Sequence, residues 1–60
     1  MNWFTFTASM HIDWRDKHLV YVEADDIKSA YDKLDNAGFA DYRYTDRPSV
    51  YSHLENHELR

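Results

Sequence analysis

The sequence of 60 residues contains no cysteine, one glycine and one proline. Without cysteine there is no disulfide and no thiolate metal site, a composition that fits a reducing cytoplasm. A single glycine excludes the glycine-rich loops that hold nucleotide phosphates. No apolar run approaches the roughly 18 residues of a membrane-spanning helix, and residues 1–10 lack the features of a signal peptide. We therefore expect a soluble, cytoplasmic protein with no membrane contact.

Aliphatic side chains are also few. Leucine, isoleucine, valine and phenylalanine together number twelve, a fraction close to that of disordered chains. Seven tryptophan and tyrosine residues offset this shortage, because each large aromatic side chain can bury about 150–250 Å². Sixty residues lie near the lower limit for a domain that folds without metal or disulfide. The composition predicts a single domain over residues 1–60 with a small, aromatic core.

The spacing of apolar residues predicts the element order β-β-α-β. Residues 3–12 alternate between apolar and polar side chains, as in a half-buried strand. Residues 13–17 form a charged connection, and residues 18–24 form a second strand, apolar on both faces and therefore central. Residues 39–45 alternate again and form a third strand. We expect an antiparallel sheet of three to four strands with one helix on one face, an α+β fold.

Local signals at both ends define a helix over residues 26–37. Asp25 is placed to act as N-cap, and Asp26 adds favourable negative charge to the first turn. Gly38 follows the last apolar position, where a left-handed residue commonly ends a helix. Between them, apolar residues recur at helical spacing and form one stripe: Ile27, Ala30, Tyr31, Leu34 and Ala37.

The C-terminal third carries weaker signals. Pro48 fits a turn over residues 46–49, and residues 50–54 suit either a short fourth strand or a helical turn. Residues 55–60 are polar, and we expect this tail to fray. Because one helix covers one face only, the other face exposes Trp3, Leu19 and Tyr21. Such an aromatic surface indicates a protein contact or a homodimer interface.

The net charge of −4 is concentrated in one segment. Six carboxylates and two lysines lie between Glu23 and Asp41, and their balance equals the charge of the whole chain. Such a field suits a basic partner and opposes direct binding to nucleic acid. The alternative is a solvated face that keeps a small domain soluble. On the first interpretation, the partner-binding residues are Glu23, Asp25, Asp26, Asp32 and Asp35, with Trp14 and Tyr21 as aromatic anchors.

Signals for catalysis and for metal binding are weak. No serine lies in a glycine-bracketed turn, and so short a chain rarely encloses a pocket of about 300 Å³. We therefore expect no enzyme. His53 and His57 would share a helix face, with Glu58 beside them, but a metal site needs three or four ligands of defined geometry. We expect two exposed tail histidines, no metal and no cofactor, and surface positions for His11 and His18 beside the first hairpin.

In length, acidity and the Glu23–Asp41 charge block, the whole chain resembles the short, cysteine-free, single-domain inhibitors that bacteriophages encode, anti-CRISPR proteins above all. No family motif is matched, so no residue role is transferred. The resemblance implies a non-enzymatic inhibitor in the cytoplasm of a bacterial host. Its partner would be a basic nucleic-acid-binding defence protein of the CRISPR effector type, bound through an acidic, DNA-mimicking surface. The alternative is a small protein–protein interaction or homo-oligomerisation module that uses the aromatic sheet face.

Overall fold

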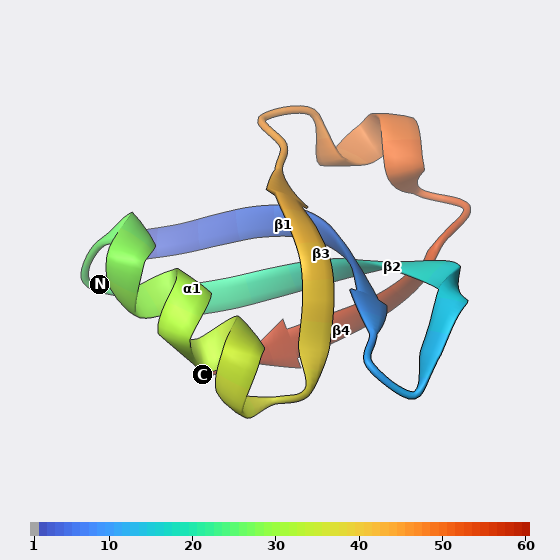
Figure 1. The fold of residues 1–60 in the computed structure, drawn as a ribbon. Coiled ribbons are helices and arrows are strands. Elements are labelled where there is room, and N and C mark those ends of the chain that lie inside the picture. Colours follow the sequence, from blue (N-terminus) through green and yellow to red (C-terminus); the bar gives the residue numbers. More distant parts are fainter. Residues whose placement is uncertain (1) are drawn as a thin grey trace.

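The computed structural model describes residues 2–60, and its elements follow the order β-β-α-β with one further strand (Figure 1). The α+β class and the predicted element order are confirmed. The elements are β1 (Asn2–Met10), β2 (Asp13–Ala24), α1 (Ile27–Asn36), β3 (Phe39–Tyr44), a 3₁₀ helix η1 (Pro48–Tyr51) and β4 (Glu55–Leu59).

The four strands form one sheet in the order β3-β1-β2-β4. β1 pairs antiparallel with β2 and with β3, whereas β4 pairs parallel with β2. The sheet is therefore mixed, unlike the purely antiparallel sheet that the sequence predicts. Parallel pairing requires the chain to cross the sheet before β4, and the segment with η1 provides this crossing (Figure 1).

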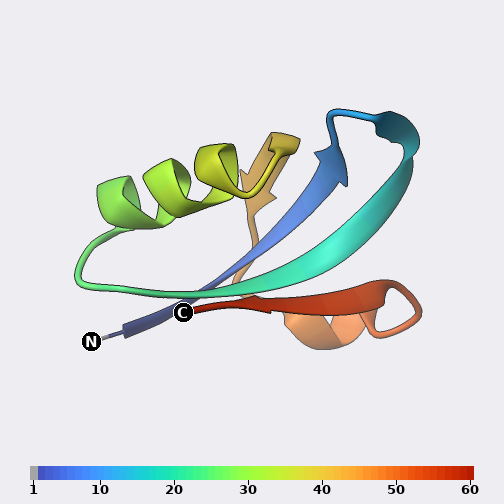
Figure 2. The ribbon, with the colours of Figure 1, turned by 90° about the horizontal axis from the view of Figure 1, so that it is seen from below.

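The two crossover connections lie on opposite faces of the sheet. α1 leads from β2 to β3 on one face, and the η1 segment leads back from β3 to β4 on the other (Figure 2). The second crossover runs across the sheet in the direction opposite to the first and lies on the opposite face. The two crossovers therefore have the same handedness, in agreement with the strong preference for one handedness in such connections. η1 thus lies on the face that we expected to be bare. On this face Leu19 is only 1% exposed, whereas Trp3 remains 45% exposed.

The helix begins and ends close to its predicted limits, with a different N-cap. The N-cap is Asp26, not Asp25: its backbone is extended, and its carboxylate accepts a hydrogen bond from the Ser29 backbone N–H at 2.8 Å. Gly38 has a φ of +87°, the left-handed conformation predicted for it, and its N–H donates to the Asp35 carbonyl at 3.1 Å. These two contacts fix the limits of α1 through local hydrogen bonds.

The hydrophobic core lies between α1 and the sheet and depends on aromatic rings. Phe6 is fully buried at its centre, with ring centroids of Tyr31, Tyr42 and Tyr44 at 5.6, 6.3 and 5.9 Å. Tilted and edge-to-face contacts of this kind add to the hydrophobic gain. The buried residues of this core are Phe6, Ala8, Val20, Val22, Ala24, Ala30, Leu34 and Phe39.

A bulge in β3 directs Tyr42 toward the helix. Thr7 pairs with Arg43 but Ser9 pairs with Ala40, so β3 has one residue more than β1 at this point. Asp41 takes a φ of +53° there, a conformation that aspartate tolerates better than most residues. The extra residue moves Tyr42 to the helix face, where its ring stacks on Tyr31 at 5.4 Å.

Three predictions about connections and ends are corrected. Residues 55–60 do not form a frayed tail, since Glu55–Leu59 is strand β4. For residues 50–54 the helical-turn alternative is nearer the structure, because η1 ends at Tyr51. The first hairpin turns at residues 11–12, and β2 already begins at Asp13. Met10 pairs with Asp13, whereas the preceding residue Ser9 pairs with Lys17. Residues 14–16 therefore form a bulge in the pairing of β2 with β1.

Candidate functional site

Four of the predicted carboxylates lie on α1 or directly before it. Asp25, Asp26, Asp32 and Asp35 are all exposed. Helical spacing places Asp32 and Asp35 on one flank of α1, and the Tyr42 hydroxyl of β3 donates to Asp35 at 3.0 Å. We call these four residues the acidic helix surface.

The acidic helix surface takes part in no salt bridge among the residues that the structure describes. The ion pairs among residues 2–60 are Lys17–Asp41 at 2.8 Å, His18–Glu55 at 3.9 Å and Arg60–Glu58 at 3.9 Å. None of them involves the four aspartates. Lys33, the second lysine of the helix, donates instead to the backbone carbonyl of Glu23. The carboxylates of this surface are therefore exposed to solvent.

Two of the four aspartates also accept hydrogen bonds that stabilise the fold. The Ser29 backbone N–H donates to the Asp26 carboxylate and lowers the pKa of Asp26 below its usual value. Asp35 accepts from Tyr42. Asp41, the sixth carboxylate of the charge block, differs from this group. Its side chain accepts from Lys17, which lowers the pKa of Asp41 and neutralises its charge.

The remaining predicted partner-binding residues lie elsewhere. Tyr21 and Glu23 are opposite Thr5 and Trp3 in the ladder, so their side chains are on the face away from α1. Trp14 is 74% exposed and lies in the bulged start of β2. Of the seven residues, four therefore lie along α1 and its start, with Asp32 and Asp35 on one flank, whereas Glu23, Tyr21 and Trp14 lie elsewhere.

The Tyr42–Asp35 contact gives a test by pH titration. This hydrogen bond, followed by burial, raises the pKa of Tyr42 above its usual value near 10. The folded state thus favours the protonated phenol. Its contribution to stability is complete below about pH 10 and is lost as pH rises through the higher pKa of the folded protein. We expect Asp35→Ala to lower the Tyr42 pKa in a ¹³C NMR titration of the tyrosine rings, while the exposed-site control Asp13→Ala leaves it unchanged.

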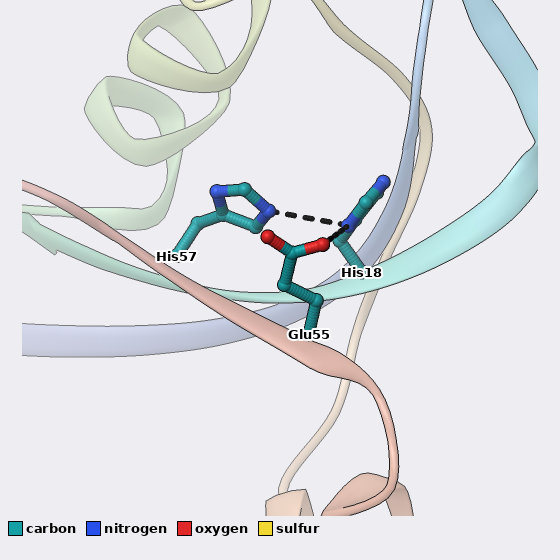
Figure 3. Close-up of side chains that lie close together, drawn as sticks. All are labelled: His18, Glu55 and His57. Atoms are coloured by element: carbon teal, nitrogen blue, oxygen red, sulfur yellow. Dashed lines mark hydrogen bonds and ion pairs between the residues drawn. The ribbon is translucent and has the colours of Figure 1, made fainter.

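A second cluster joins two strands that are distant in sequence. His18 from β2 meets Glu55 and His57 from β4 on the helix side of the sheet (Figure 3). His57 Nε2 lies 3.1 Å from His18 Nδ1, and the Glu55 carboxylate lies 3.9 Å from the same nitrogen. The His18 side chain is only 12% exposed, so the prediction of a surface position for it is wrong. We call these three residues the histidine–glutamate cluster.

The sequence pattern pointed to a different set of histidines. Spacing along the chain linked His57 to His53 and Glu58, but His57 lies in a strand and not in a helix. His53 is exposed after η1 and lines an open depression of about 560 Å³ on the other face of the sheet, larger than we expected of so short a chain. His18 and His57 are 39 residues apart, and only the parallel register of β2 and β4 brings them together.

Comparisons with known proteins add no assignment: no family model matches the chain, and neither do curated proteins or solved structures. Within the part of the chain that the structure describes, no helix is both long enough and apolar enough to span a membrane. The geometry of the two sites is therefore the basis for proposing a function.

Proposed function

We propose that the protein is a non-enzymatic inhibitor that binds a basic nucleic-acid-binding protein through the acidic helix surface. In this proposal it acts in the cytoplasm of a bacterial host, and its target is a defence protein of the CRISPR effector type. The observation that carries the proposal is that the four aspartates are exposed and take part in none of the ion pairs among residues 2–60. The lysines and arginines with which the target binds nucleic-acid phosphates would form ion pairs with these carboxylates instead.

The spacing of the charges supports mimicry of a nucleic-acid strand. Asp32 and Asp35 are three residues apart in α1, which corresponds to a helical rise of about 4.5 Å. A single strand of duplex DNA carries one phosphate per roughly 3.4 Å along its axis. The axial separation of these two carboxylates is therefore close to that of neighbouring phosphates.

Lys28 is the cation that reduces this field. It is exposed and lies one helical turn before Asp32 on α1. Replacing it with glutamate would raise the negative charge of the surface without altering the core, whose helix residues are Ala30 and Leu34. A substitution of Lys28 should therefore strengthen binding to the target, whereas substitutions of the aspartates should weaken it.

We expect Asp32→Lys/Asp35→Lys to weaken binding to the target by about tenfold or more, because each exposed charge pair contributes up to roughly 1 kcal/mol. Lys28→Glu should strengthen binding. The measurement is a pull-down from bacterial lysate with elution by a salt gradient, since such contacts weaken with ionic strength. Added duplex DNA should compete for the captured protein.

The matched control is Asp13→Lys/Asp16→Lys, which reverses two exposed carboxylates outside the helix. Equal loss of binding in both double variants would mean that only net charge matters, and full retention in Asp32→Lys/Asp35→Lys would refute the proposed surface. Light scattering of the same samples tests the alternative function, self-association through the second sheet face. Trp3, which is 45% exposed there, favours that alternative, and a monomer at high concentration contradicts it.

A further inference from the structure

We propose that His18, Glu55 and His57 form a binding site for a divalent transition-metal ion of the zinc type. The three side chains each offer one ligand atom, and these atoms lie within 4.8 Å of one another. The site is separate from the acidic helix surface and does not depend on the proposed inhibitor function.

The distances suit coordination by one ion. Zinc lies about 2.0–2.1 Å from imidazole nitrogens and about 2.0–2.2 Å from carboxylate oxygens. Two nitrogens on the same ion are therefore separated by at most about 4 Å, and His57 Nε2 and His18 Nδ1 are 3.1 Å apart. Figure 3 shows the Glu55 carboxylate directed toward the same two rings.

The donor set and its surroundings fit the chemistry. Two imidazoles and one carboxylate are a known zinc set that leaves a fourth position open. The Phe39 ring, 3% exposed, lies 5.6 Å from His57 and 6.4 Å from His18 and forms an apolar wall. Glu55 is 72% exposed, so the cluster is open to solvent on the side from which an ion would enter. Apolar groups around a metal site control solvent access to the ion.

The position of the ligands couples metal binding to folding. His18 belongs to β2, whereas Glu55 and His57 belong to β4, the edge strand that pairs parallel with it. In the unfolded chain, His18 is separated from the other two ligands by more than 35 residues of sequence. An ion that binds all three therefore favours the folded state and holds β4 against β2.

Thermal unfolding with and without zinc tests the site. After EDTA treatment and buffer exchange, we expect added ZnCl₂ to raise the Tm measured by circular dichroism. At a free concentration of about 100 times Kd the rise should be on the order of 10 °C or more for a domain of this size. Isothermal titration should show one zinc ion per chain.

Two pairs of variants separate this site from unspecific binding. Glu55→Gln should weaken zinc binding about tenfold or more, whereas Glu58→Gln, which alters an exposed carboxylate of the same strand, should not. His57→Ala should abolish the Tm rise, and His53→Ala should retain it. Because Glu55 is exposed, its variant tests the site even if His57→Ala fails to fold. No Tm rise in the parent protein, or equal responses of Glu55→Gln and Glu58→Gln, would overturn the proposal and leave only a hydrogen-bonded imidazole pair.

Discussion

Replacing Phe6 with alanine should leave most of the protein unfolded at room temperature. Phe6 is fully buried and contacts three tyrosine rings from α1 and β3. Removing a buried phenylalanine ring costs about 3–5 kcal/mol, because transfer energy is lost and a cavity remains. A core of this size rarely provides more than about 3–5 kcal/mol in total. The single change therefore removes a quantity comparable to the whole stability.

Urea unfolding followed by circular dichroism measures this effect. The matched control is Ile12→Ala, because Ile12 is 91% exposed in the first turn and should change stability by no more than about 0.5 kcal/mol. Phe6→Leu should fall between the two, since it keeps part of the apolar volume. Parent-like unfolding midpoints for Phe6→Ala would show that the aromatic cluster is not the main source of stability.

The helix and the first strands could be predicted because their signals are local. The apolar stripe, the acidic cap and Gly38 all lie within residues 25–38, and each agrees with the others. The N-cap was misplaced by one residue because Asp25 and Asp26 are chemically equivalent candidates. Only the Asp26–Ser29 hydrogen bond distinguishes them.

The strand β4 and the bulge in β3 could not be predicted because their causes are not local. β4 is an edge strand with mostly exposed side chains, so its sequence has the polarity of a tail. β4 pairs with β2 through backbone hydrogen bonds, and these produce no pattern of side chains in the sequence. The bulge at Asp41 likewise depends on the register between β1 and β3. Without it, strict alternation would place Tyr42 on the wrong face.

The two candidate sites differ in the same way. The acidic helix surface could be predicted from sequence, because helical spacing alone places Asp32 and Asp35 together. The register of β2 with β1 places Glu23 and Tyr21 on the face of the sheet away from α1. The histidine–glutamate cluster depends entirely on the pairing of β4 with β2, so the spacing along the chain, which relates His57 to His53, could not indicate it.

A chain that ends at Leu54 should fail to fold stably. This truncation removes β4, exposes the edge of β2 and removes Leu59, which packs against the core. β2 is paired on both sides in the sheet, and its buried residues Val20 and Val22 would lose their neighbours on one side. Since the domain has only about 3–5 kcal/mol to lose, we expect a broad, low-temperature transition or none in circular dichroism.

The control is a chain that ends at Leu59, which lacks only the exposed Arg60 and keeps every paired residue of β4. It should unfold within a few degrees of the parent protein, because the interactions of Arg60 with the described residues are an ion pair and a contact with the Trp3 ring, both at the surface. The comparison decides between a strand and a frayed tail, since a tail contributes nothing when removed. If the chain ending at Leu54 unfolded as the parent does, β4 would not stabilise β2, and the histidine–glutamate cluster would lose the strand that assembles it.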